Sequence, residues 1–171
     1  DALLRTHPGD PRFHLLRGRA RRKLGDLDGA LADLSVAAPD RGSGSEALLY
    51  RGLVHRALGN LPAAATDLRE SCARGPADAD RCSWLGAVLY ESGAWGEAAD
   101  ALRAFLEEKG VQTGIHWTPG HHFSLFKDCP HDDLAGTEAF YASIISLPFY
   151  TDMTAEECQF VSGLMGDYFR G

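Results

Sequence analysis

Several residues with metal-binding side chains lie close together in the last third of the chain. They are His116, His121, His122, Cys129 and His131. Imidazole nitrogens and a thiolate form a ligand set that suits zinc. However, no pair has the C-x2-C or H-x3-H spacing that places two ligands side by side on a turn or helix. The spacing therefore predicts no metal site, and zinc stays an alternative interpretation of this cluster.

The cysteines indicate a reduced protein rather than a disulfide framework. They are Cys72, Cys82, Cys129 and Cys158. None of them forms a C-x2-C pair, and a chain of 171 residues with 44% hydrophobic residues can build a core without covalent cross-links. We therefore expect free thiols and a cytoplasmic location.

Arginines in the first third of the chain form a second group with recognisable chemistry. Arg19, Arg22 and Arg56 carry guanidinium groups, which bind carboxylates through paired hydrogen bonds. Whether they can act together depends on the elements that present them. Those elements follow from an internal repeat.

Glycine, alanine and leucine recur at an interval of 34 residues. One glycine would let two helices pack closely, and a second would end a helix in the left-handed conformation. The alanine suits a helix crossing, and the leucine lies on the same face, toward the core. The four columns are Gly18, Gly52 and Gly86; Gly25, Gly59 and Gly93; Ala30, Ala64 and Ala98; and Leu34, Leu68 and Leu102.

These columns fall in segments that resemble tetratricopeptide repeats, namely RGRARRKLGDLDGALADL, RGLVHRALGNLPAAATDL and LGAVLYESGAWGEAADAL. The resemblance implies a short solenoid of three helix–turn–helix repeats, at residues 11–44, 45–78 and 79–108. The helix pairs are expected at 13–24 and 28–38, at 46–58 and 62–74, and at 80–92 and 95–108. Residues 1–10 would be the end of a preceding helical repeat, so further repeats are expected upstream.

The resemblance also implies a peptide groove on the concave face, lined by the first helix of each pair. The residues expected there are Leu15, Arg19, Arg22, Leu49, Leu53, Arg56, Ser83, Ala87 and Tyr90. The arginines would form a basic patch in a chain of net charge −7, which favours an acidic protein or peptide as the partner. The alternative is that they are solvated or pair with neighbouring acidic side chains. Because leucines stand where a polar clamp would be needed, chaperone binding is not predicted.

The repeat columns stop after Leu102, and the composition changes. The β-branched residues of 111–117 predict a strand, and residues 137–146 predict a helix. Thr154 and Glu157 have the spacing of a capping box, which predicts a final helix that continues to Phe169.

Three stretches of this region resemble the C-terminal end of the nucleotide-sugar aminotransferases that use pyridoxal phosphate, the DegT/DnrJ/EryC1/StrS-like family. They are LRAFLEEKGVQTGIHWTPGHH, LAGTEAFYASIISLPFY and TDMTAEECQFVSGL. The resemblance implies a small α/β segment at residues 101–171 that shares a helix, 101–109, with the third repeat. It also implies that His116, Trp117 and His121 lie near substrate or cofactor in the full enzymes, with Trp117 where the family prefers tyrosine.

The catalytic lysine of this family, which forms a Schiff base with the cofactor, lies in a large domain that residues 1–100 do not resemble. Lys23 is the only lysine in that range, and Lys109 and Lys127 lie outside the matching motifs. No glycine-rich phosphate-binding loop is visible. The sequence therefore predicts no catalytic residue and no cofactor, with pyridoxal phosphate bound only if another polypeptide supplies the large domain.

The sequence as a whole predicts a mainly α protein with a short solenoid followed by a small α/β unit. An acidic chain with a pI near 5.4 is not expected to bind nucleic acid, and no apolar run is long enough for a membrane helix. The expected function is a protein- or peptide-binding scaffold with a non-catalytic aminotransferase-like unit. The alternative is a fragment or accessory part of a sugar aminotransferase, which would then be its partner, and self-association is a further alternative.

Overall fold

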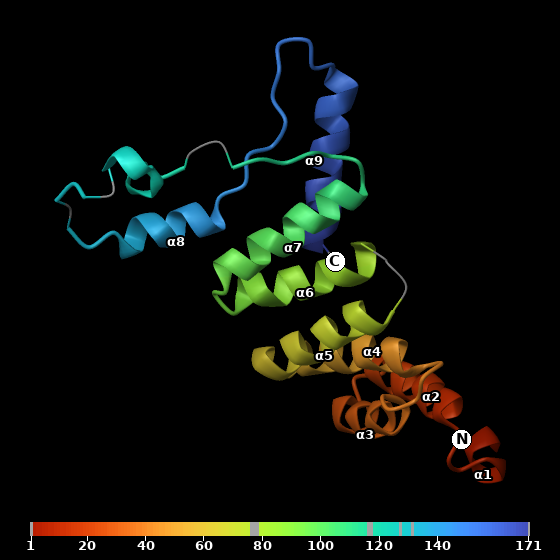
Figure 1. Ribbon diagram of the computed structural model, residues 1–171. Coiled ribbons are helices and arrows are strands. Elements are labelled where there is room, and N and C mark those ends of the chain that lie inside the picture. The colour runs from red at the N-terminus through yellow and green to blue at the C-terminus, as the bar shows by residue number, and fades with distance from the viewer. Residues whose placement is uncertain (1, 76–78, 116–117, 127, 131, 171) are drawn as a thin grey trace.

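The structure is a computed structural model that describes residues 2–75, 79–115, 118–126, 128–130 and 132–170. After a short helix α1 (Ala2–Thr6), the chain forms antiparallel helix pairs that stack into a solenoid (Figure 1). The pairs are α2 (Pro11–Lys23) with α3 (Leu27–Ala37), α4 (Gly44–Ala57) with α5 (Leu61–Arg74), and α6 (Ala79–Glu91) with α7 (Trp95–Glu108). Each expected helix of the repeats is present, with ends within two residues of the expected ones.

Local signals at the helix ends explain these boundaries. The side chains of Asp26 and Asn60 accept hydrogen bonds from the backbone N–H groups at the starts of α3 and α5. Gly25, Gly59 and Gly93 end the first helix of each pair with φ angles of 83°, 75° and 78°. Residues that carry a side chain rarely adopt this left-handed backbone conformation, so glycine fits each turn.

The glycines inside the first helices allow the pairs to close tightly. A Cβ atom at Gly18 would lie 2.7 Å from Cγ of Leu34, and a Cβ atom at Gly52 would lie 2.8 Å from Cγ of Leu68. Both distances are shorter than van der Waals contact. The leucine column therefore packs directly on the glycine column within each of the first two repeats.

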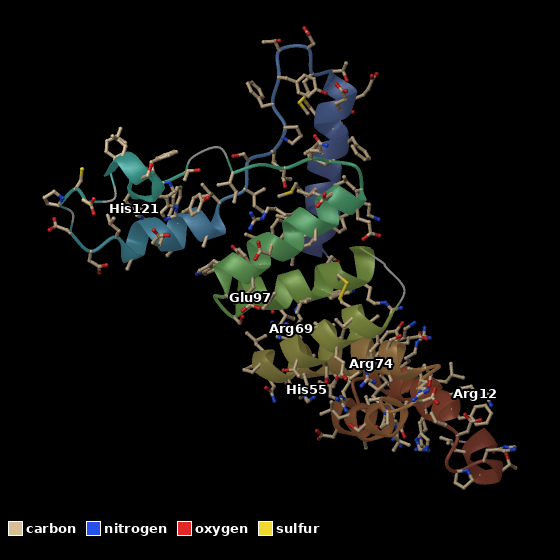
Figure 2. All side chains as sticks on the ribbon, in the orientation of Figure 1. Arg12, His55, Arg69, Arg74, Glu97 and His121 are labelled. Atoms are coloured by element: carbon tan, nitrogen blue, oxygen red, sulfur yellow. A yellow bond between two sulfur atoms is a disulfide. The ribbon has the colours of Figure 1, made fainter. Side chains whose placement is uncertain are left out.

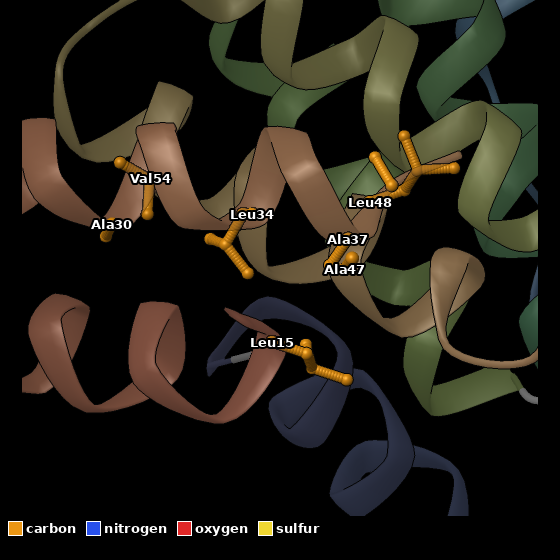
Figure 3. Packing of buried hydrophobic residues seen from close by; sticks show 8 residues of the cluster. Leu15, Ala30, Leu34, Ala37, Ala47, Leu48 and Val54 are labelled. Carbon is orange, nitrogen blue, oxygen red and sulfur yellow. The ribbon is translucent and has the colours of Figure 1, made fainter. Parts of the chain in front are cut away.

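The hydrophobic core runs from one repeat into the next rather than closing within each repeat. Figure 3 shows buried residues from α2, α3 and α4 packed in one cluster. The cluster contains Leu15, Ala30, Leu34, Ala37, Ala38, Ala47, Leu48 and Val54. Stacking of neighbouring repeats is what removes these side chains from water, as is usual for a solenoid.

The C-terminal helices α8 (Ala135–Ser143) and α9 (Ala155–Arg170) follow the solenoid, and α9 packs on the third pair. The side chain of Tyr168 reaches Gly86 of α6, where a Cβ atom would overlap its hydroxyl group. Phe105 and Leu106 of α7 complete this second cluster with Val161 of α9. The helix α9 therefore covers the end of the repeat stack.

The prediction of a small α/β unit does not hold for the part of the chain that the structure describes, because that part contains no strand. Gly114 and Ser146 form an isolated antiparallel bridge, with N···O distances of 3.0 and 2.8 Å. Two extended segments with one paired residue each lack the neighbouring strands that stabilise a sheet. Between them lie two short 3-10 helices, η1 (Gly120–His122) and η2 (Ser124–Phe126), and α8, which together form an arm that projects from the solenoid (Figure 1).

The expectation of free thiols is wrong for one pair of cysteines. Cys72 of α5 and Cys82 of α6 form a disulfide, with their Cα atoms 5.6 Å apart. The sequence search looked for neighbouring cysteines, whereas this pair meets because α6 stacks on α5. Cys129 and Cys158 are free and exposed.

No helix in the described part of the chain combines the length and the apolar character that crossing a membrane requires.

Candidate partner-binding surface

The first helices of the three pairs carry alternating arginine and aromatic side chains that contact one another between repeats. The guanidinium carbon atoms of Arg19 and Arg22 lie 4.6 and 5.5 Å from the ring centre of Tyr50 in the next repeat. That of Arg56 lies 5.4 Å from the ring centre of Trp84. These are cation–π distances. We call this set of residues the arginine–aromatic ladder.

Two arginines of the ladder also pair with acidic residues of the following repeat. Arg19 Nη1 donates to Glu46 Oε1 at 2.8 Å, and Arg56 Nη2 donates to Glu91 Oε1 at 2.5 Å. This is the arrangement of the alternative interpretation, in which the arginines pair with neighbouring acids. Arg22 differs, because it makes no ion pair with the residues that the structure describes and its Nε is buried without a hydrogen-bond partner.

The other residues expected in the groove have different environments. Leu15 is only 6% exposed and belongs to the core. The prediction that it lines an open groove is therefore wrong. Ser83 and Ala87 are also buried, at 4% and 7% exposed. The side chains of Leu49 and Leu53 are half-buried. Tyr90 is 52% exposed.

Tyr90 occupies the position in the third repeat that Arg22 and Arg56 hold in the first two. Its ring makes edge contacts with Trp95, at 4.9 Å between ring centres, and with Phe169 of α9, at 6.0 Å. The ladder therefore ends where α9 begins to cover the stack. A cavity of about 270 Å³ lies here, lined by residues that include Gly86, Tyr90, Trp95 and Tyr168.

Buried carboxylates form a polar feature that the sequence analysis missed. Asp33 of α3 accepts hydrogen bonds from Arg17 Nε and Arg21 Nη1, each at 2.8 Å, and lies 2.9 Å from His14 Nδ1. In the second repeat, Asp67 accepts two hydrogen bonds from Arg51, both at 2.7 Å. We call each of these arrangements an arginine–aspartate lock.

The signal for the locks is present in the sequence at the 34-residue interval. Arg17 corresponds to Arg51, and Asp33 corresponds to Asp67. A search of the repeat columns for charged residues, and not only for glycine, alanine and leucine, would have found them. Since both partners lie within one helix pair, the locks hold the first and the second helix pair together.

Of the residues expected near a substrate, the structure describes His121, and it is not part of the ladder. His116 and Trp117 fall outside the residues that the structure describes. His121 lies in η1, on the arm and away from the labelled side chains of the solenoid (Figure 2). Its Nε2, and that of His122, point to Glu138 Oε1 of α8, with a distance of 2.7 Å for His122. Hydrogen bonds from the two imidazoles, the larger effect coming from His121, lower the pKa of Glu138.

The helix pairs, the left-handed glycines at their turns and the shared core define a helical-repeat protein of the tetratricopeptide class. The tetratricopeptide repeat model matches residues 1–46. The model of the DegT/DnrJ/EryC1/StrS aminotransferase family matches residues 57–165, which is well over half of the chain. The chain belongs to this family. The match begins at Ala57, before the stretches that carry the resemblance described above, and includes the helices α5, α6 and α7 of the solenoid.

The described residues do not fit the pyridoxal phosphate that this family implies. A Schiff base requires a lysine that projects into a cofactor pocket. Lys23 ends α2 on the exposed surface of the first repeat, and Lys109 lies over the ring of Phe105 at 5.6 Å. Neither lines the cavity between α6, α7 and α9. Lys127 is outside the described residues. The described residues therefore place no lysine where it could hold the cofactor.

Proposed function

We propose that the chain is a protein-binding scaffold, in which the arginine–aromatic ladder binds an acidic segment of a partner and the aminotransferase-related part is non-catalytic. The observation that supports this proposal is the environment of Arg22. It stacks on Tyr50 and has no acidic partner among the described residues. A carboxylate from a partner protein would give the guanidinium group of Arg22 a negatively charged partner.

The neighbouring ion pairs make the same surface adaptable. The side chains of Arg19 and Arg56 keep 37% and 29% of their surface exposed, and their acidic partners are exposed to a similar extent. Ion pairs of this kind contribute little to stability, roughly 0–1 kcal/mol. A partner carboxylate can therefore replace Glu46 or Glu91 at small cost, because the exchange keeps the charge-assisted hydrogen bonds of each guanidinium group.

The proposal is tested with the full chain as bait in a lysate of the source organism. The ladder variant carries Arg19→Ala, Arg22→Ala and Arg56→Ala. The control variant carries Arg12→Ala, Arg69→Ala and Arg103→Ala, which removes the same charge from exposed ion pairs outside the ladder. We expect the wild type and the control to retain the same partner, and the ladder variant to lose it.

Two further measurements make the result specific to recognition. Circular dichroism melting of all three proteins shows whether the ladder variant is still folded at the temperature of the assay. The complex should weaken when NaCl is raised from about 50 to 500 mM, because exposed charge contacts are screened. A partner that a folded ladder variant retains at both salt concentrations would contradict the proposal.

The family match favours a second candidate, namely that the chain is an accessory part of a sugar aminotransferase. The test adds the purified chain to a family aminotransferase from the same organism, with a nucleotide-linked keto-sugar as substrate. Transamination rate and oligomeric state are measured with and without the chain. If both are unchanged at saturating chain, this candidate fails.

A further inference from the structure

Two imidazoles and a carboxylate converge on the arm, away from the ladder. They belong to His121 and His122 of η1 and to Glu138 in the first turn of α8. One ligand atom from each lies within 4.8 Å of the other two. We propose that His121, His122 and Glu138 bind a divalent transition-metal ion, with zinc as the ion that fits them best.

The ligand types support zinc. Neutral imidazole nitrogen and carboxylate oxygen are common zinc ligands, at about 2.0–2.2 Å from the ion. Calcium and magnesium prefer shells made only of oxygen, which two histidines do not provide. Two histidines and a glutamate leave a fourth tetrahedral position, which water can fill, since the side chains of His122 and Glu138 are 34% and 46% exposed.

The present geometry is close to that of a bound site. Ligand atoms around a tetrahedral zinc ion lie about 3.3 Å apart. His122 Nε2 is now 2.7 Å from Glu138 Oε1, which is a hydrogen-bond distance. Small side-chain rotations at this exposed site would open the space for the ion. Each imidazole would then carry its hydrogen on Nδ1 and direct the Nε2 lone pair to the metal.

Neighbouring rings already orient the two histidines. The rings of His121 and His122 are 4.6 Å apart in an edge arrangement, and His122 makes a similar contact with Tyr141 of α8, at 5.3 Å. These contacts place both Nε2 atoms on the side that faces Glu138. The free thiol of Cys129 lines the same pocket as His121, so its part in the site is tested separately below.

The ion would have a structural consequence for the arm. The helix α8 buries no side chain, and η1 is a single turn, so few apolar contacts join them. A metal ion bound by residues of both elements would cross-link them. The histidines lack a zinc spacing, and Glu138 lies 16 residues after His122, so the sequence alone does not predict this site.

The test uses the full chain, without an affinity tag, after dialysis against a chelator. Zinc is titrated in competition with a chromophoric chelator, and cobalt(II) binding is followed by visible absorption. We expect one equivalent of tightly bound metal in the wild type. Glu138→Gln and His122→Asn should each weaken binding by at least about tenfold, as loss of a ligand does.

A matched control carries His7→Asn and Glu156→Gln, which remove an exposed histidine and an exposed glutamate elsewhere. It should bind metal as the wild type does. Cys129→Ser separates a site with a thiolate from a site with water, because only thiolate coordination gives a sulfur-to-cobalt charge-transfer band, and either spectrum supports a site that depends on Glu138. Hydrogen exchange of amides in η1 and α8 should slow with zinc in the wild type and in the matched control, but not in Glu138→Gln or His122→Asn.

Two results would overturn the proposal. One is the absence of stoichiometric binding at micromolar zinc. The other is equal binding by the wild type and by both ligand variants. Either would leave the three side chains as a hydrogen-bonded cluster.

Discussion

Asp33 shows how much of this fold depends on single charged residues. Its side chain is 3% exposed, and the titratable and charged groups that face it are His14, Arg17 and Arg21. Burial alone would raise the pKa of its carboxyl group. The hydrogen bonds from Arg17 and His14, with the charges of Arg17 and Arg21, outweigh burial and hold the pKa below its ordinary value.

Replacing this carboxylate by an amide should therefore destabilise the protein. We expect Asp33→Asn to lower the free energy of unfolding by roughly 2–3 kcal/mol, somewhat less than for a fully buried pair, because the arginines remain partly exposed. Urea unfolding at pH 7 measures the change. Asp28→Asn, on the exposed face of the same helix, is the control and should change it by less than about 0.5 kcal/mol.

The same substitution has a defined pH dependence. Because the pKa of Asp33 is lower in the folded state, its stabilising contribution is fully present above the pKa of the unfolded chain, which is about 3.9. That contribution is lost as the pH falls through the folded-state pKa. The difference in stability between wild type and Asp33→Asn should thus shrink below about pH 4. A difference that grows on acidification would show that another group controls it.

At the scale of elements, the disulfide between α5 and α6 fixes the stacking of the second and third repeats. A cross-link across 10 residues stabilises a protein by about 2–3 kcal/mol when it acts on the entropy of the unfolded chain. We expect Cys72→Ser with Cys82→Ser to lose about that much in urea unfolding. Cys129→Ser with Cys158→Ser should leave stability nearly unchanged, since both are exposed.

A thiol count provides an independent check on this prediction. The denatured, unreduced chain should react as two thiols, from Cys129 and Cys158. Four reactive thiols would mean that the disulfide is not formed in the purified protein.

The helices were predictable because their signals are local. The capping box is an example: the backbone N–H of Thr154 donates to Glu157 Oε2 at 2.8 Å, and the backbone N–H of Glu157 donates to Thr154 Oγ1 at 3.2 Å. Both bonds involve residues three positions apart, so spacing alone identifies them. The strand expected at 111–117 had only composition to support it, and a strand exists only if distant partners pair with it.

The candidate sites were less predictable, because they join residues from different elements. The arginines of the ladder were expected on one face, but their aromatic and acidic partners come from the next repeat, as Tyr50 and Glu46 do for Arg19. Glu138 meets the two histidines only because α8 folds back along η1. Contacts of this kind depend on how helices stack, which sequence spacing does not give.

At the scale of the whole molecule, α9 replaces a fourth repeat. The third repeat has Leu85, Ala101 and Tyr90 where the first two have the lock arginine, the lock aspartate and the ladder arginine. Ala101 lies beside Gly86, and Tyr168 and Phe169 of α9 pack against Gly86 and Tyr90. The polar links between and within repeats therefore give way to apolar contacts where α9 docks.

Removing the ring of Tyr168 should undock α9. The residue is 2% exposed, and comparable aromatic-to-alanine substitutions cost about 3–5 kcal/mol. We expect Tyr168→Ala to lower the free energy of unfolding by that amount and to increase hydrogen exchange along α9 first. Tyr168→Phe is the control: the buried hydroxyl has no hydrogen-bond partner among the described residues, so its removal should be neutral or slightly stabilising. Equal losses in both variants would contradict this account.

The change of residue types in the third repeat also determines where such an array can grow. The first two repeats carry the same lock, the same close approach of leucine to glycine and the same ladder arginine, so one can follow the other without altering either neighbour. The third repeat has a notch at Gly86 into which the side chain of Tyr168 reaches from α9. Duplication of the second repeat would lengthen the molecule and preserve both of its ends, whereas duplication of the third would leave an internal notch empty. The first two repeats can thus be copied as a unit, whereas a copy of the third repeat would need its own α9.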